Sequence, residues 1–354
     1  MRKIFALFVS LVLIACSATV LGDVTGFDSR YLMAGLTGLS FISMPSGVLS
    51  MAVTKEIWLN DIVENLFKAN PHLDKAFNAD SFVLQGKVVH IPQAGSKSVA
   101  TKNRTVFPAT VVTRTDTDVT FALDEFSTEP TKISNADKYE LSYDKRNSVM
   151  GGQSSALAES VGDWFFYYWA AVVAAGQKRT TGANVAAHIG TGVRKLVTMS
   201  DVKGIAKVMD NQGVSKADRY ACLDAEMYDQ FTDTLTATQN RDFSMAYDQA
   251  TGVVGKLFGF TFLENRPTVL AYNNDALPVV YDPSAAPVAA TAMAAGLFWQ
   301  KDCVIRALGT NEFFENIADP QYYGDIYSAL IRAGGRLRRA DNKGVVALIQ
   351  AIGV

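Results

Sequence analysis

Apolar side chains recur at helical spacing in the first third of the chain. Leu59, Ile62, Val63, Leu66 and Phe67 fall on one face of a helix. Thr54 can cap the N-terminus of that helix, and Glu56 suits the positive end of its dipole. A helix is therefore predicted to begin shortly after Met51.

A longer helix is predicted from about Ser148 to Gly176. Its centre, residues 164–169, reads Trp-Phe-Phe-Tyr-Tyr-Trp and is aromatic on every side. A helix that is apolar all round is buried on more than one face. This segment is therefore interpreted as a core helix.

Three more helices are expected further along the chain. Residues 201–211 place Ile205, Val208 and Met209 inward and end before Gly213. Asp224 can cap a helix that continues to Leu235, with Tyr228, Phe231 and Leu235 on one face. Residues 289–308 are predicted to be largely helical.

Strand patterns dominate the segment before the long helix. Residues 88–92 are predicted as a short strand, and residues 105–112 and 119–126 as a hairpin that turns at 113–118. A polar stretch precedes the hairpin, and the hairpin has no evident core of its own. A two-stranded hairpin is marginal alone and leaves open edges, so a neighbouring subunit is expected to cover it.

Further strands are predicted in the second half of the chain. They span residues 219–223, residues 255–262, and a pair formed by 326–333 and 344–351 around the basic residues 336–339. Together with the helices, they predict a mixed α+β fold.

The first fifty residues differ from the rest. Arg2 and Lys3 precede an apolar run, and Leu13-Ile14-Ala15-Cys16 is typical of a secretory signal and of a bacterial lipobox, in which Cys16 is lipidated. The next stretch is apolar and glycine-rich, unlike a polar lipoprotein tether. Residues 1–50 are interpreted as an over-extended reading frame or a dispensable leader outside the fold. A lipoprotein leader and a membrane segment stay as alternatives.

Composition and charge narrow the class of partner. Charged residues make up 19% of the 354 residues, against about 25% in an average protein. A weakly charged surface is typical of a protein that buries surface against its own copies. The net charge of −2 gives no global attraction to nucleic acid. Three cysteines are too few for a disulfide framework in a chain of this length.

No pattern of catalytic or metal-binding residues stands out. The histidines, His72, His90 and His188, have no metal-type spacing, and a nucleophile elbow is missing. Residues 190–192 and 252–257 are glycine-marked and are interpreted as turns. No catalytic, cofactor-binding or metal-binding residue is therefore predicted, and no small-molecule substrate.

The order of these parts resembles a known family from about Met51 to the C-terminus. Residues 107–121 and 124–130 look like an extended loop, and residues 141–146 look like its return into a spine helix. The likeness continues in three later stretches. They are residues 219–224 with the helix that follows, the glycine-marked strand at 255–260, and Asp319-Pro320 with Gly324-Asp325. The chain thus resembles the major capsid proteins of tailed bacteriophages, with the Hong Kong 97 phage-type capsid fold, as in phages and prophages of Bacteroidota.

The resemblance implies a domain organisation. It comprises an N-terminal helix or arm at 51–85, an extended β loop at 86–145, a peripheral domain with the spine helix at 146–190 and 311–354, and an axial domain at 191–310. It also implies residues that contact other subunits. These are Lys97, Lys102, Arg104, Phe107, Asp124, Glu125, Arg336, Arg338 and Arg339.

The implied function is that of a self-assembling, non-enzymatic subunit of an icosahedral phage head. The implied partners are copies of the chain in pentamers and hexamers, a portal protein, scaffold, protease or decoration proteins, and double-stranded DNA packaged without sequence specificity. The implied location is the virion, after assembly in the host bacterial cytoplasm. Two alternatives stay open: a membrane-anchored lipoprotein that acts as a surface binding module, and an encapsulin-like shell protein.

Overall fold

A computed structural model describes residues 46–84, 87–93, 100–105, 107–108, 111, 113, 116–134, 145–170, 172–264 and 266–353. The chain divides into two compact units, Met1–Trp58 and Leu59–Val354. The sheets and cavities described below belong to the second unit. Helix α3 (Ser46–Ala69) starts earlier than predicted. It runs through Met51 because Leu49, Met51 and Ala52 are themselves good helix formers.

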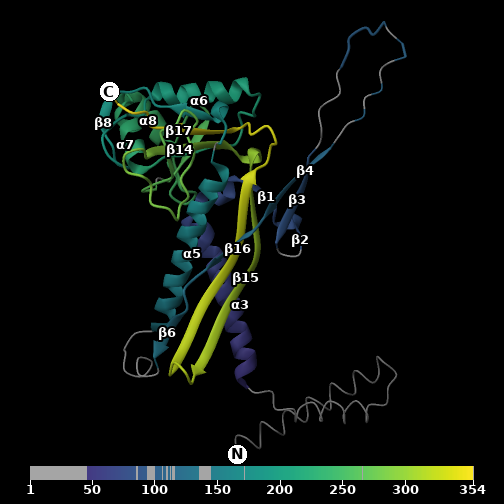
Figure 1. Cartoon of the computed structure of the whole chain (residues 1–354), viewed down its shortest axis with the longest axis vertical. Coiled ribbons are helices and arrows are strands. Elements are labelled where there is room, and N and C mark those ends of the chain that lie inside the picture. The colour runs from purple at the N-terminus through teal and green to yellow at the C-terminus, as the bar shows by residue number, and fades with distance from the viewer. Residues whose placement is uncertain are drawn as a thin grey trace, which may run out of the picture. The chain divides into compact units, whose positions relative to one another are not determined.

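The first sheet is built around a long antiparallel hairpin. Its strand order is β1-β15-β16-β5, and β6 also pairs with β16. The strands are β1 (Phe77–Asn78), β5 (Asp124–Ser127), β6 (Thr131–Ser134), β15 (Val304–Asp319) and β16 (Gly324–Leu337). Helix α5 (Lys145–Trp169) packs along this hairpin (Figure 1).

Two buried hydrogen bonds fix helix α5 to the hairpin. The Nε2 atom of Gln153 donates to the carbonyl of Tyr327 at 2.8 Å, and the Nε1 atom of Trp169 donates to the carbonyl of Ile305 at 2.8 Å. The prediction that α5 is buried on more than one face is wrong: Phe165, Phe166 and Trp169 lie on one face and are fully buried, whereas Trp164, Tyr167 and Tyr168 on the other side are only half-buried.

Helix α5 ends at Trp169, earlier than the predicted end at Gly176. The β-branched Val172 and Val173 disfavour its continuation. The chain instead forms the short 3-10 helix η3 (Ala174–Gly176) and strand β7 (Gln177–Arg179).

The second sheet has the order β11-β12-β10-β14-β17-β7, with β13 also paired to β14. Its remaining strands are β10 (Arg219–Cys222), β11 (Val253–Leu257), β12 (Phe260–Leu263), β13 (Leu270–Tyr272), β14 (Met293–Gln300) and β17 (Val345–Ile349). Every residue of β14 and β17 is buried. These two strands therefore form the centre of the core.

Three sequence predictions are wrong in this region. Residues 289–308 are not helical; they contain β14, the 3-10 helix η4 (Lys301–Cys303) and the start of β15. The predicted strand 255–262 is a hairpin of β11 and β12, which turns at Phe258 and Gly259. The segments 326–333 and 344–351 do not pair together, because β16 pairs with β15 while β17 pairs with β14.

Three helices and a two-stranded sheet accompany the second sheet. The helices are α6 (Met199–Asn211), α7 (Ala225–Asp233) and α8 (Ala237–Ser244), and the strands are β8 (Asn184–Ala186) and β9 (Val193–Lys195). The prediction for α6 is confirmed for Ile205 and Met209, which are fully buried, and for Gly213, which ends the helix with a φ of +67°; Val208 is only half-buried. Helix α7 follows Asp224 as predicted, but it ends at Asp233, before the predicted end at Leu235, and the carboxylate of Asp224 makes no capping hydrogen bond.

A three-stranded sheet forms the base of the extended loop. Its order is β2 (Val83–Leu84), β3 (Val88–Gln93) and β4 (Thr117–Ala122), and it follows the 3-10 helices η1 (Pro71–Lys75) and η2 (Asp80–Phe82). Strand β4 pairs with β3 and not with residues 105–112. The described residues of that stretch lie outside any strand. The hairpin was thus predicted with the wrong partner.

The base of the loop also has a core, which the sequence analysis did not expect. Val89, Ile91 and Leu123 are buried against Ala79, which follows β1, and against Ile305 and Ala307 of β15. The arm beyond this base is different, since residues 100–105 are exposed and Phe107 and Val111 have exposed fractions of 74% and 93%.

Candidate functional site

Three cavities lie beside helix α5, with volumes of about 660, 330 and 440 Å³. Ala156 and Ser160 line both the first and the second, and Asp163 and Pro283 line both the second and the third. We call the three cavities together the acidic groove, for the carboxylates described below.

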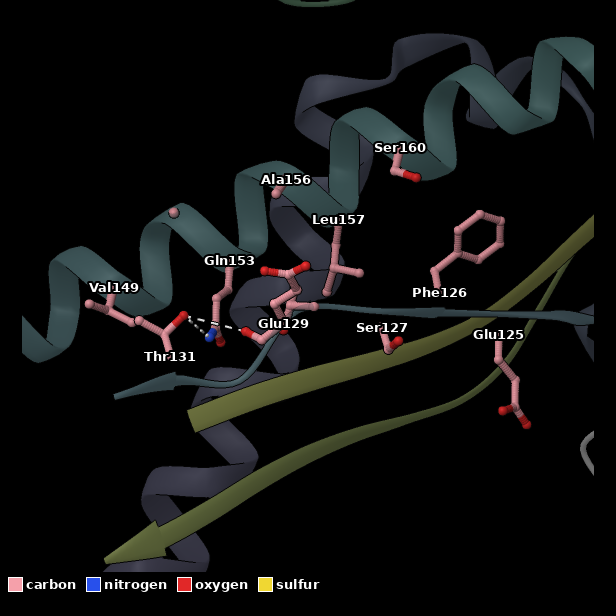
Figure 2. A pocket seen from close by; sticks show the side chains of 12 residues that line it. Glu125, Phe126, Ser127, Glu129, Thr131, Val149, Gln153, Ala156, Leu157 and Ser160 are labelled. Atoms are coloured by element: carbon pink, nitrogen blue, oxygen red, sulfur yellow. Dashed lines mark hydrogen bonds between the residues drawn. The ribbon is translucent and has the colours of Figure 1, made fainter. Parts of the chain in front are cut away.

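The wall opposite α5 in the first cavity comes from β5, β6 and the segment between them (Figure 2). Gln153 ties the two walls together, because its Nε2 atom lies 3.3 Å from the hydroxyl of Thr131. Phe126 points toward α5. Its ring centroid lies 6.3 Å from that of Trp164 on the helix. On the helix side, a Cβ atom added to Gly152 would find no atom within 4 Å, so the groove is open there.

Five carboxylates line the groove. They are Glu125, Glu129, Glu159, Asp163 and Asp282. No lysine or arginine is among the described lining residues. Two of the five are neutralised within the chain: Glu125 accepts from Arg332 at 3.0 Å, and Asp163 lies 3.3 Å from Arg266. Burial raises the pKa of Asp163 despite this nearby guanidinium. For the other three, the described residues provide no ion pair.

A buried pair stands at the far end of the groove. His188 lines the third cavity, and its Nε2 atom contacts the carboxylate of Asp224 at 3.0 Å. The second oxygen of Asp224 accepts from the backbone N–H of Val269 at 2.9 Å. Burial raises the pKa of Asp224, and the hydrogen bond from His188 opposes that shift. The pair joins the β8–β9 turn to the start of α7.

A separate cavity of about 310 Å³ is lined by His72, Cys222 and Arg266, among others. His72 stacks on Phe166, with ring centroids 4.1 Å apart, and burial holds its pKa well below the ordinary value. Burial also raises the pKa of Cys222 to about 12, so its thiol stays protonated at neutral pH. Neither group is prepared as an acid, base or nucleophile near pH 7.

The predicted contact residues of the arm are exposed where the structure describes them. Lys102, Arg104 and Phe107 all project from the molecule. Lys97 lies outside the described residues, as does Cys16. A role of these residues in subunit contact stays a prediction.

Asp124 and Glu125 make contacts within the chain. Asp124 accepts a hydrogen bond from the hydroxyl of Tyr168 on α5, and this bond and the nearby carboxylate add to burial in raising the pKa of that phenol. Glu125 pairs with Arg332 across β5 and β16. Both side chains are nevertheless exposed at the surface, and their role in subunit contact stays a prediction.

The three predicted arginines also have partners in their own chain. Arg336 donates to the carbonyl of Thr120 at 2.7 Å, which joins β16 to the base of the arm. Arg338 lies over the ring of Phe77 at 4.0 Å. Arg339 forms a two-point contact with Asp341, at 2.9 and 2.8 Å. Their proposed contact with other subunits is not tested by these interactions.

The sequence analysis missed the acidic groove. Glu129, Glu159 and Asp282 are far apart in the sequence, so no local motif joins them. One signal was present: residues 81–115 contain no aspartate or glutamate. That separation of charge pointed to a basic arm and to an acidic surface elsewhere.

Other classes of site are not represented in the described ranges. Within them, no group of three or more His, Cys, Asp or Glu residues is placed to hold a metal ion. The helices in these ranges are all too short or too polar to cross a membrane.

Comparison with known proteins identifies the fold. No protein-family model and no curated protein sequence matches the chain. Solved structures of phage capsids do match. The capsid of the cyanophage P-SCSP1u has 18% sequence identity and a TM-score of 0.55, over 79% of this chain and 87% of that one. The capsid of Ralstonia phage GP4 has 10% identity and a TM-score of 0.58, over 79% and 88%.

The capsid of a native GTA particle is also similar, with 13% identity and a TM-score of 0.55, over 80% of this chain and 90% of that one. At such low identity the likeness concerns the fold. The chain has the α+β capsid fold that the sequence resemblance implied, and the match covers most of both proteins.

Proposed function

We propose that this chain is a major capsid protein, the structural subunit of the icosahedral head of a tailed double-stranded DNA bacteriophage or prophage. The observation that carries the proposal is the arm beyond the β2–β3–β4 sheet. Its described residues are exposed in a single chain, on a fold shared with capsid subunits over about four fifths of its length.

An exposed arm of this kind is costly for a monomer. Phe107 and Val111 leave apolar surface in water, which burial would stabilise by about 25 cal/mol per Å². Packing against neighbouring copies removes that surface, and obligate interfaces commonly bury more than about 2,000 Å². Pentamers and hexamers in which the arm lies across a neighbour satisfy this requirement.

The strand pairings support a division into two functional domains. We assign the first sheet with α5 to the peripheral domain and the second sheet with helices α6, α7 and α8 to the axial domain. This assignment places residues 177–179 and 345–349 in the axial domain, because β17 pairs with β14 and β7. It places residues 77–78, 124–127, 131–134 and 304–310 in the peripheral domain, because their strands belong to the first sheet.

The proposed partners follow from this role. Copies of the chain are the principal partner, and a portal protein, a scaffold or protease, and decoration proteins would complete the head. Packaged DNA would meet the inner surface without sequence specificity, since a net charge of −2 provides only local attraction. Assembly would take place in the host cytoplasm, and the mature protein would be part of the virion.

Sedimentation of the purified full-length chain tests the proposal. We expect large particles to form as the protein concentration rises, and a protease site in the arm, such as the bond after Lys102 or Arg104, to become protected in the particle fraction. A protein that stays monomeric at all concentrations, with its arm already protected, would contradict it. Recovery of lipidated Cys16 from membranes would support a lipoprotein instead.

A further inference from the structure

We infer that three lysines on one side of helix α6 bind the phosphate backbone of double-stranded DNA. They are Lys178 of β7 and Lys203 and Lys207 of α6, and we call them together the lysine patch. The inference rests on the proposed function and deepens it, because it names the surface of the subunit that meets the packaged DNA.

Helix α6 brings two of the lysines together. Lys203 and Lys207 are four residues apart, so their side chains leave neighbouring turns of the same face. Both residues are exposed. The buried face of the helix carries Val202, Ile205 and Met209. Burial of these three residues therefore fixes the direction of the two lysines, which is toward solvent.

The third lysine comes from the edge of the second sheet. A Cβ atom added to Gly204 would lie 3.3 Å from the Cε atom of Lys178 and 3.4 Å from its Nζ atom. The ammonium group of Lys178 thus lies against α6 at the residue that follows Lys203. Positions 203, 204 and 207 fall within about 100° of the helix circumference. The three positive charges are therefore on the same side of the helix.

The positive charge of the patch is not neutralised inside the described part of the chain, where none of the three lysines forms an ion pair with a carboxylate. The two carboxylates of α6 are engaged elsewhere. Asp201 is buried and accepts from the hydroxyl of Thr181 at 2.7 Å. Asp210 pairs with Arg219 at 2.8 Å and with Lys216 at 3.4 Å. Like charges four residues apart on a helix repel each other, so the patch favours an anionic partner.

Double-stranded DNA is the polyanion that the proposed function brings to every subunit. It carries one negative charge per about 1.7 Å of its axis, so several ammonium groups on one side of a helix can contact phosphates at once. Such contacts do not read the sequence, as packaging of any sequence requires. The net charge of −2 gives the chain no overall attraction to DNA, so a local patch has to supply it.

Three phosphate contacts from one subunit give weak binding. A closed shell presents the same patch once in every copy, and linked contacts of this kind strengthen one another without any new contact. The inference therefore places the lysine patch on the inner surface of the shell.

The salt dependence of DNA binding tests the inference. A short duplex of mixed sequence is titrated with the full-length chain, at protein concentrations below those at which particles form, and binding is followed by fluorescence anisotropy at a series of salt concentrations. Each phosphate contact adds about 0.9 to the magnitude of the slope of log K against log salt. The slope thus counts the contacts that a variant has lost.

We expect Lys203→Gln/Lys207→Gln to reduce the magnitude of the slope by about 1.8, and the further change Lys178→Gln to reduce it by about 0.9 more. Lys203→Arg/Lys207→Arg should keep the slope of the unsubstituted chain, because arginine retains the charge and binds phosphate.

The matched control is Lys132→Gln/Lys256→Gln. It removes the same charge from two exposed lysines that lie on different sheets, Lys132 on β6 and Lys256 on β11. A response to net charge alone would appear equally in both double variants, whereas a response to the patch should leave the control unchanged.

Assembled shells give a second readout. Closed shells formed without DNA should bind added duplex less tightly than the free chain does, because the patch faces the interior. Shells of the unsubstituted chain and of Lys203→Gln/Lys207→Gln should not differ in this residual binding.

Equal slopes for the unsubstituted chain and the triple variant would overturn the inference, as would intact shells that bind DNA through the patch. Tighter binding of polyglutamate than of the duplex, lost in the triple variant, would overturn it in favour of an acidic protein segment. If the slopes change as expected but the chain forms no particle under any condition, the proposed function alone is contradicted.

Discussion

The Nε2 atom of His188 lies 3.0 Å from the Oδ2 atom of Asp224, whose carboxylate is completely buried. This contact explains why Asp224 precedes helix α7 without capping it, since its other oxygen accepts from the N–H of Val269. A buried carboxylate is expensive unless it is fully hydrogen-bonded. The pair thus holds the β8–β9 turn against the second sheet.

Replacement of His188 should therefore be costly. We expect His188→Ala to lower the free energy of unfolding by about 2–4 kcal/mol, because it leaves Asp224 buried with one partner fewer. The control is His90→Ala. His90 contacts Asp118 at 2.8 Å, but both side chains are nearly half exposed, so the loss there should stay below about 1 kcal/mol. Denaturant unfolding measures both, and equal losses would contradict this role of the pair.

Two glycines of helix α5 should respond to alanine with opposite signs. At Gly162, an added Cβ would lie 2.0 Å from the Oδ1 atom of Asn70 and 2.8 Å from the Nη1 atom of Arg266. Asn70 is itself fixed by its bond to the carbonyl of Ala158 at 2.7 Å. Gly162→Ala should therefore cost about 1–3 kcal/mol.

Gly152→Ala should instead stabilise the protein by about 0.5–1 kcal/mol, because the site is open and alanine is the better helix former. Thermal unfolding of the two variants checks the difference. The packing described around Gly162 is wrong if both variants stabilise the protein.

Two tryptophans of α5 should also differ. Trp169 is fully buried and its Nε1 atom donates to the carbonyl of Ile305 at 2.8 Å, whereas Trp164 is half-buried. Trp169→Phe leaves that carbonyl without its partner and opens a cavity, so a loss of about 2–4 kcal/mol is expected. Trp164→Phe should cost less than about 1 kcal/mol. Denaturant unfolding measures both losses. A larger loss at Trp164 than at Trp169 would contradict the assignment of the Trp169 face to the core.

The contact of Arg339 with Asp341 should affect how the free energy of unfolding changes with pH under acidic conditions. Hydrogen bonds from Arg339 lower the pKa of Asp341 from 3.8 to about 2. A carboxyl whose pKa is lower in the folded state stabilises the fold above its unfolded pKa, and loses that contribution as the pH falls through the folded value.

The difference in stability between Arg339→Gln and the unsubstituted chain should thus be constant above about pH 5 and shrink as the pH falls toward 2. Both side chains are about 40% exposed, so solvent keeps the effect below about 1 kcal/mol. Unfolding measured at a series of pH values tests it, and a difference that grows toward pH 2 would have the wrong sign.

Local patterns predicted the elements whose form depends on their own residues. Helix α6 has its capping residue Thr198, its inward face and its terminal Gly213, and its bounds were close to those predicted. The aromatic centre of α5 predicted a buried helix, but only the face with Phe165, Phe166 and Trp169 is fully buried. The α+β class and the capsid fold followed from the order of such elements.

The wrong predictions concern elements that distant partners define. Strand β14 is an apolar run buried on both faces, and periodicity alone does not distinguish such a strand from a buried helix. It becomes a strand because β10, β13 and β17 pair with it. Strand β4 likewise takes β3 as its partner across a long connection.

The candidate site was predictable only in part for the same reason. The arm residues Lys102 and Arg104 were named from the sequence, but the carboxylates of the groove come from β5, the β5–β6 connection, α5 and the loop before β14. Only the folded chain brings these segments together.

Electron cryomicroscopy of particles formed by the purified full-length chain tests the central claim most directly. The account predicts closed icosahedral shells in which the arm of each subunit lies across a neighbour, with Phe107 and Val111 covered by that neighbour. Monomers or small open oligomers at every concentration, with the arm folded onto its own subunit, would contradict it.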